Sequence, residues 1–142
     1  MSWLSDRRIV VPIDFSDESQ MALDVALELS ASAASITVIH VAANFNMISP
    51  EAAWIDISEE SRRDTLTRDF QKQFAGSKYS GLRFEVVFGD PGHQIAEFAR
   101  ENSAGLIVMP TTGRTGLSHL LIGSVAERVV RYAHCPVLIL RK

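Results

Sequence analysis

LIVMPTTGRTGLSHLLIGSVAERVVRYAHCPVLIL, residues Leu106 to Leu140, is the stretch that decides the fold of this chain. Its first four residues are apolar and end at Pro110, which is typical of a strand buried on both faces. A loop with glycines follows. Ser124 then stands three residues before Glu127, a spacing that predicts a helix capped by the serine. The last four residues are apolar again and predict a second strand.

The same alternation extends through the rest of the chain. Apolar runs at residues 8–14, 35–41 and 82–88 predict three more strands, and residues 16–30, 51–75 and the stretch after Pro91 predict the helices between them. A strand–helix unit repeated four times and closed by a strand implies an α/β fold, with an open parallel five-stranded sheet and helices on both faces. The pattern alone allows the strand orders 3-2-1-4-5 and 2-1-3-4-5.

Length and composition predict a single domain over residues 1–142. The chain is 46% hydrophobic and 22% charged, which suits a globular domain with a substantial core. A formal net charge of −3 argues against general nucleic-acid binding. No run approaches the roughly 18 apolar residues of a membrane span, and the first residues lack an apolar signal core, so we expect a cytoplasmic protein. Cys135 is the only cysteine, and we expect it to be a packing residue.

The glycine-bearing loop has the properties of an anion site. It joins the carboxyl end of a strand to the start of a helix, where backbone N–H groups lack partners and the helix dipole is positive. Glycine lets the backbone approach a ligand closely. A phosphate is the group that suits such a loop. The alternative is that Gly113 and Gly116 only form turns and that Ser124 only caps its helix.

The stretch resembles the C-terminal signature of the universal stress protein family, which is Gly, two residues, Gly, nine residues, Gly, and then Ser or Thr. Gly113, Gly123 and Ser124 match this spacing. The first glycine would fall at position 110, where this chain has Pro110, a residue with no N–H and a fixed φ. In the family the signature cradles the phosphates of ATP. The resemblance therefore implies that ATP or another adenine nucleotide binds here.

The resemblance includes V-P-I-D-F-S at residues 11–16 and G-D-P at residues 89–91, and it implies the strand order 3-2-1-4-5. It places Asp14 and Pro12 near the nucleoside and Val41 against the base. A carboxylate can accept from a ribose hydroxyl or the adenine amine, although Asp14 could instead cap a turn. The expected nucleotide-binding residues are Pro12, Asp14, Val41, Met109, Thr112, Gly113, Arg114, Gly123, Ser124 and Val125.

Within this set, the phosphates are expected on the backbone N–H groups of Thr112, Gly113, Gly123 and Ser124 and on the Ser124 hydroxyl, with Arg114 adding positive charge. Mg²⁺ or Mn²⁺ is left open as a companion of the nucleotide. His40 has no second metal-type residue at a suitable spacing, so it is expected to have a local partner in the sheet. His119 fits a phosphate or metal contact and a solvated loop equally well.

Other nucleotide chemistries lack their motifs. The chain has no G-x-x-x-x-G-K-[ST], and no G-x-G-x-x-G follows its first strand. No Ser-His-Asp or Cys-His set is specified by spacing, so no catalytic residue is assigned and an enzymatic role, if any, is limited to weak ATP hydrolysis.

Three functions follow from these features. The first is a stress-response protein that binds ATP or AMP as a sensor or regulator with little turnover. The second is a dimeric interaction module of the same fold without a nucleotide, which Pro110 favours. The third is a slow ATP hydrolase. The strand at residues 136–140 would leave an exposed apolar edge in a monomer, and family members pair this edge, so we expect a homodimer.

Overall fold

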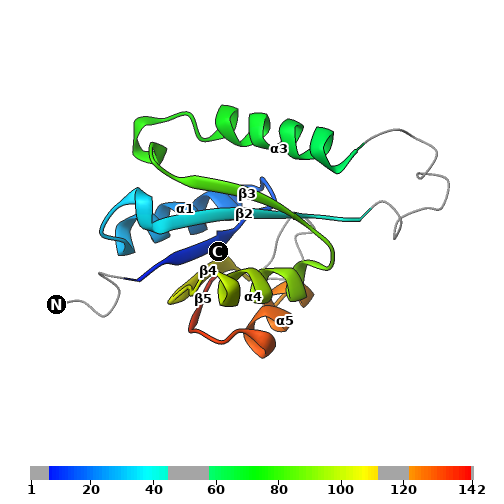
Figure 1. Cartoon of the computed structure of the whole chain (residues 1–142). Coiled ribbons are helices and arrows are strands. Elements are labelled where there is room, and N and C mark those ends of the chain that lie inside the picture. Colours follow the sequence, from blue (N-terminus) through cyan, green and yellow to red (C-terminus); the bar gives the residue numbers. More distant parts are fainter. Residues whose placement is uncertain (1–6, 45–57, 112–121, 142) are drawn as a thin grey trace.

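The structure is a computed structural model that describes residues 7–44, 58–111 and 122–141, and its core is a five-stranded parallel sheet (Figure 1). The spatial order is β3-β2-β1-β4-β5, with every neighbouring pair parallel. This confirms the order 3-2-1-4-5 and excludes 2-1-3-4-5. The strands are β1 Ile9–Pro12, β2 Ile36–Ala42, β3 Arg83–Phe88, β4 Leu106–Pro110 and β5 Val137–Leu140.

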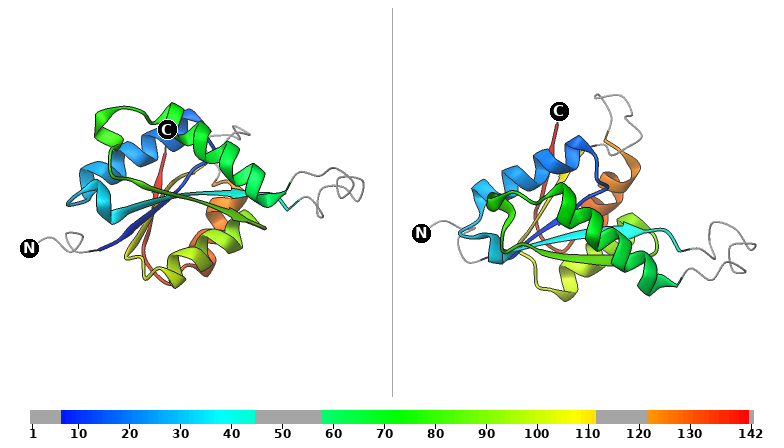
Figure 2. Two further views of the ribbon diagram at one scale, coloured as in Figure 1. Left: turned by 45° about the horizontal axis from the view of Figure 1, so that its top comes forward. Right: turned by 90° about the horizontal axis from the view of Figure 1, so that it is seen from above.

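In the described part of the chain, two helices cover each face of the sheet (Figures 1 and 2). On one face lie α1 Asp17–Leu29 and α3 Glu59–Gln73, and on the other lie α4 Pro91–Glu101 and α5 Ser124–Tyr132. Short 3-10 helices, η1 Ala33–Ser35 and η3 Ser77–Tyr79, precede β2 and β3. In the described ranges no helix has the length and apolarity needed to cross a membrane. The helix expected at residues 51–75 is seen as α3, and residues 45–57 lie outside the description.

The central strands β1 and β4 are apolar throughout because they contribute to two cores at once. In β1, Ile9 and Val11 face α1 and α3, whereas Val10 faces α4 and α5. In β4, Val108 and Ile107 divide between the same two cores. All residues of β1 and β4 are buried, while the residues of β5 are half-buried and those of β3 range from exposed to buried, as their edge positions require.

Aromatic side chains attach α3 to the edge strand β3. The ring of Phe70 stacks on the ring of Phe84, with centroids 4.3 Å apart and planes 6° apart. Phe74 meets Phe70 on one side and Tyr79 on the other, at centroid distances of 5.0 and 5.1 Å. Phe70 and Phe74 are buried, as their four-residue spacing predicts, so this otherwise charged helix is held by a short aromatic stripe.

Side chains cap the starts of α1 and α4. Ser16 accepts from the Ser19 N–H at the start of α1, and Asp90 caps α4 with Pro91 in its first turn. At α5 the expected Ser124 cap is wrong. Gly123 is the N-cap, without any side-chain cap bond, and Ser124 is the first helical residue.

A tertiary contact explains this shift at α5. The Gly123 N–H donates to the Thr111 carbonyl at 2.7 Å, and the Gly123 carbonyl accepts from the Glu127 N–H at 3.0 Å. Gly123 is thereby tied to the end of β4 and begins the helix one residue earlier than the capping pattern indicates.

Candidate functional site

The strand order reverses between the neighbouring strands β1 and β4. The helix after β1 packs on one face of the sheet, and the helix after β4 packs on the other. The connections leaving the two strands therefore diverge at their carboxyl ends, which is where open α/β sheets bind ligands. The Asp14 turn follows β1, and Gly123 and Ser124 begin the helix that follows β4.

Asp14 is held in a tight turn between β1 and α1. Its Oδ1 accepts from the Ser16 N–H at 3.0 Å and from the Ser19 hydroxyl at 2.7 Å, while its own N–H donates to the Ser19 oxygen at 2.9 Å. Asp14 thus caps its turn, as one reading of the sequence expected. The carboxylate is half-buried at the sheet edge, and its part in nucleoside binding stays a prediction.

The residue after Asp14 has a strained backbone conformation, and its side chain packs against β2. Phe15 has a φ of 66°, in the left-handed region that favours glycine. Its ring lies 5.0 Å from the ring of His40, and the His40 Nδ1 is 2.8 Å from the Ile13 carbonyl oxygen. His40 therefore has the local partner that was expected, and it supports the turn that carries Asp14.

The amino end of α5 offers backbone donors at the same edge. An α-helix leaves its first N–H groups without partners inside the helix. At α5 the N-cap is Gly123, and within the described part of the chain no side-chain cap bond is made there. The N–H of Gly123 itself is engaged by Thr111, so the donors that point out of the helix end begin at Ser124. Ser124 is exposed and stands in the first turn, where the helix dipole is positive.

Three expected site residues come together on the face covered by α4 and α5. Met109 belongs to the apolar cluster there, and Val41 and Val125 pack against it. Pro12 is buried at the end of β1, where it pairs in register with Ile39. The end of the sheet thus has an apolar wall beside a polar turn and a helix end, which suits a ligand with a flat apolar part and an anionic part.

Pro110 costs no hydrogen bond between β4 and β5. The Ile107 N–H donates to the carbonyl of Pro136, just before β5, and the Thr111 N–H donates to the carbonyl of Leu140 in β5, at 3.0 Å in each case. Because N–H groups alternate sides along a strand, position 110 faces β1 instead. Pro110 is the last residue of β4, and the β1–β4 register pairs Ile9 and Val10 with the first two residues of β4. A proline is therefore tolerated here by the sheet.

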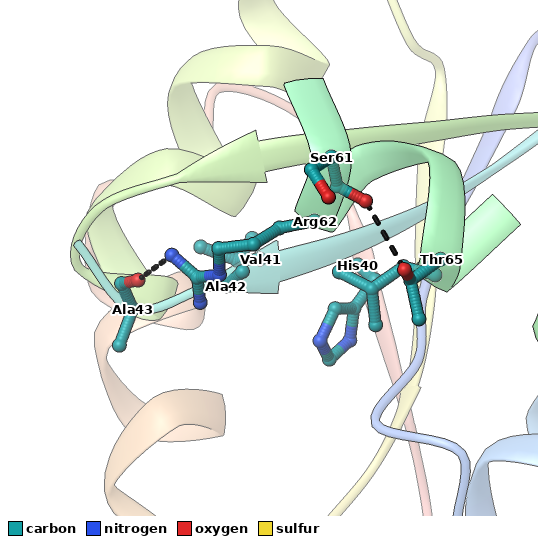
Figure 3. Close-up of a pocket in the computed structure, with 8 residues that line it drawn as sticks. His40, Val41, Ala42, Ala43, Ser61, Arg62 and Thr65 are labelled. Atoms are coloured by element: carbon teal, nitrogen blue, oxygen red, sulfur yellow. Dashed lines mark hydrogen bonds between the residues drawn. The ribbon is translucent and has the colours of Figure 1, made fainter. Parts of the chain in front are cut away.

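A cavity of about 470 Å³ lies between the end of β2 and the first turns of α3 (Figure 3). Arg62 crosses the end of β2 and donates from Nη1 to the Ala43 carbonyl at 2.8 Å, while its guanidinium lies 5.1 Å from the centre of the Phe88 ring. The Thr65 hydroxyl donates to the Ser61 carbonyl at 3.1 Å. The lining residues are His40, Val41, Ala42, Ala43, Ser61, Arg62, Thr65 and Leu66.

Sequence reasoning missed the α3 part of this cavity. The spacing of Ser61, Arg62 and Thr65 places them on one side of a helix, but nothing in that spacing says which strand they meet. Val41 lines the cavity and also packs against the cluster under α4 and α5, so it is common to the cavity and to the candidate site.

Some expected residues cannot be placed. Thr112, Gly113, Arg114 and His119 lie outside the described residues. Among the residues that are described, no group of three or more His, Cys, Asp or Glu could hold a metal ion. Burial raises the pKa of the Cys135 thiol, which packs against the core under α4 and α5, so this cysteine has the environment of a packing residue and not of a nucleophile.

Comparison with known proteins gives one consistent family. Residues 6–141 match the model of the universal stress protein family. The universal stress protein MJ0531 of Methanocaldococcus jannaschii is 40% identical over 143 residues, covering 96% of this chain and 82% of its own. The universal stress protein UspA of Lactobacillus plantarum superimposes with a TM-score of 0.72 at 25% identity, covering 96% of this chain and 99% of its own.

A second solved structure, a universal stress protein in complex with cAMP, superimposes with a TM-score of 0.61 at 27% identity, covering 95% of this chain and 96% of its own. The fold, the strand order and the family model therefore agree, and the chain belongs to the universal stress protein family.

Proposed function

We propose that this protein binds an adenine nucleotide, ATP or AMP, at the crevice between β1 and β4, and acts in the cytoplasm as a stress-response sensor or regulator with little turnover. The observation that carries the proposal is the amino end of α5, which begins at Gly123 without a side-chain cap bond from the described residues and which follows β4 at the sheet edge that also carries Asp14. Unpartnered N–H groups and the positive end of a dipole favour a phosphate there.

Each part of a nucleotide has a counterpart at this edge. The phosphates bind the N–H groups of Ser124 and Val125 and the Ser124 hydroxyl. The ribose lies near Asp14. The base lies against the apolar wall that Val41 and Met109 form. Thr112, Gly113 and Arg114 complete the phosphate loop in this proposal, with Mg²⁺ or Mn²⁺ on the phosphates where a metal takes part. A universal stress protein with a cAMP complex supports an adenine nucleotide as the ligand.

The substitution Ser124→Asp tests the proposed phosphate site at the start of α5. A carboxylate in the first turn interacts well with the helix dipole, so α5 stays folded, but it repels a phosphate from the same N–H groups. We expect ATP binding, measured by isothermal titration calorimetry with and without Mg²⁺, to weaken by about tenfold or more, because hydrogen bonds to charged groups contribute roughly 1.5–3 kcal/mol.

Ser58→Asp is the matched control. Ser58 is the N-cap of α3 and accepts from the Ser61 N–H at 3.1 Å, and aspartate caps a helix as well as serine does. It changes the net charge by the same amount at another helix start and should leave ATP affinity unchanged. Wild-type protein that binds neither ATP nor AMP at millimolar concentration would refute the proposal and favour the interaction module.

A second observation favours a homodimer through β5. This strand pairs with β4 on one side and is the edge of the sheet on the other, and its four apolar residues are only half-buried. Nearby on α5, Val130 and Tyr132 are exposed. An open apolar edge invites pairing with a second copy. Analytical ultracentrifugation should show a dimer at tens of micromolar, and a monomer at that concentration would contradict this part of the proposal.

A further inference from the structure

An ion pair joins the start of α4 to α5. Arg128 donates from Nη1 to the Asp90 Oδ1 at 2.6 Å. The other carboxylate oxygen, Oδ2, accepts from the His93 N–H at 3.1 Å and so caps α4. Asp90 thus links the first turn of α4 to a residue one helical turn beyond Ser124, the start of α5.

The stem of Arg128 runs close to the α4 backbone because position 92 is glycine. A Cβ built on Gly92 would lie 2.6 Å from the Arg128 Cβ and 3.1 Å from its Cδ. Gly92 is buried, so the two helices meet here at the shortest distance that the missing side chain allows. The direction of the Arg128 stem, and with it the approach of the guanidinium to Asp90, follows from this packing.

The beginning of α5 is therefore tied at two points. The Gly123 N–H bonds to the Thr111 carbonyl at the end of β4, and Arg128 bonds to Asp90 at the start of α4. The hydrogen bond to Thr111 fixes where the helix starts, and the ion pair with Asp90 fixes how the helix is rotated and tilted against α4. Together they set the direction of the first-turn N–H groups.

We propose that Asp90 and Arg128 are positioning residues that hold the amino end of α5 in place for an anion. This inference rests on the proposed function for its consequence in nucleotide binding, but the positioning itself is measurable without a ligand. The side chain of Asp90 is 37% exposed and that of Arg128 is 53% exposed, and ion pairs as exposed as this change an equilibrium constant by no more than about fivefold. The effect is accordingly local, with little change in the midpoint of thermal unfolding.

Amide hydrogen exchange followed by NMR tests the positioning directly. The reporters are the N–H of Gly123, bonded to Thr111, and the N–H of Glu127, bonded to the Gly123 carbonyl. Asp90→Asn keeps a cap for α4 and removes the charge, and Arg128→Gln keeps most of the stem. Each variant should raise the opening constants at both reporters by about two- to fivefold, and the double variant should go no further than the larger single effect.

Arg131→Gln is the control on the same helix, because it breaks the exposed Arg131–Glu127 pair within α5 without touching α4. Arg128→Lys, which keeps the charge, should restore part of the protection at the two reporters. Additive effects of Asp90→Asn and Arg128→Gln, or an equal effect of Arg131→Gln, would overturn the positioning role.

Calorimetric titration of the same variants with ATP separates this inference from the proposed function. A loss of ATP affinity by about the same factor as the rise in the opening constants supports both the positioning role and the proposed nucleotide site. If the exchange effects of Asp90→Asn and Arg128→Gln are coupled but ATP affinity is unchanged, the positioning role is supported and the proposed phosphate site on α5 is contradicted.

Discussion

The side chain of Ser19 and the backbone and side chain of Asp14 exchange hydrogen bonds: the serine hydroxyl donates to Asp14 Oδ1 at 2.7 Å, and the Asp14 N–H donates back to the serine oxygen at 2.9 Å. Ser19 is 1% exposed, so water cannot replace either bond. Ser19→Ala should lower the free energy of unfolding by about 1–3 kcal/mol, because the Asp14 N–H loses its partner. Urea denaturation followed by circular dichroism measures this change.

The same variant reports on the nucleotide site, because a looser turn no longer holds Asp14. ATP affinity should fall more in Ser19→Ala than in Ser35→Ala, which removes an exposed serine hydroxyl bonded to the Ser32 carbonyl. Equal ATP affinities in the two variants would show that the Asp14 turn does not contribute to binding.

Gly92→Ala should destabilise the protein although alanine is the better helix former. Helix propensity alone favours alanine by about 1 kcal/mol. The new Cβ would however meet the root of the Arg128 side chain at 2.6 Å, which can move only if α5 moves away from α4. We expect a net loss of about 1–3 kcal/mol in urea denaturation.

Gly76→Ala is the matched control for this substitution. A Cβ at position 76 meets the Tyr79 ring at an ordinary 3.7 Å, so little change in stability is expected. A Gly92→Ala protein as stable as the wild type would show that the contact between α4 and α5 is looser than the structure has it.

Phe70 should be the residue of α3 whose truncation costs most. It is 7% exposed and stacks on Phe84 of the edge strand. Phe70→Ala removes the ring and leaves a cavity under the helix, with an expected loss of about 3–5 kcal/mol, whereas Phe70→Leu should cost less because it refills most of the volume. Leu66→Ala, at a half-buried position of the same helix, is the control with a smaller effect. Equal losses at positions 66 and 70 would contradict the stacking role.

The helices and strands could be predicted from the sequence because their information is local, whereas the strand order 3-2-1-4-5 was implied only by the resemblance to the family. Apolar runs such as Leu106–Met109 identify buried strands, and Asp90 followed by Pro91 identifies a helix start by residue type alone. The contact between Gly92 and Arg128 could not be predicted in this way. The two residues are 36 positions apart in sequence and lie on different helices. A glycine in the first turn of a helix gives no indication of which side chain will pack across it.

The surroundings of the candidate site residues could be predicted only in part. Met109 belongs to the apolar core under α4 and α5, and Val41 and Val125 pack against it, while their part in nucleotide binding stays a prediction. Ser124 differs, because the capping pattern S-x-x-E describes only a helix and its neighbours. The bond from Gly123 to the Thr111 carbonyl comes from the end of β4, and it moves the helix start without any change in that local pattern.

Tyr79 predicts how stability depends on alkaline pH. Burial, and after it the hydrogen bond that its hydroxyl donates to Asp24 at 2.7 Å, raise the pKa of Tyr79. The folded protein therefore holds the neutral phenol more firmly than the unfolded chain does, in which a tyrosine titrates near pH 10. The stability that Tyr79 contributes is fully present below that pH and is lost as the pH rises through the higher pKa of the folded state.

Tyr79→Phe tests this sign. The variant should be less stable than the wild type at pH 8, since it lacks the bond to Asp24, and its free energy of unfolding should fall less steeply above pH 10. The difference in absorbance at 295 nm between wild type and variant follows Tyr79 alone, because the signal of Tyr132 cancels. Its midpoint should lie above the midpoint of the same difference in urea. Asp24→Asn, which keeps an acceptor without the charge, should lower the folded midpoint only in part, because burial remains. A folded midpoint equal to the unfolded one would mean that η3 does not hold the phenol against α1.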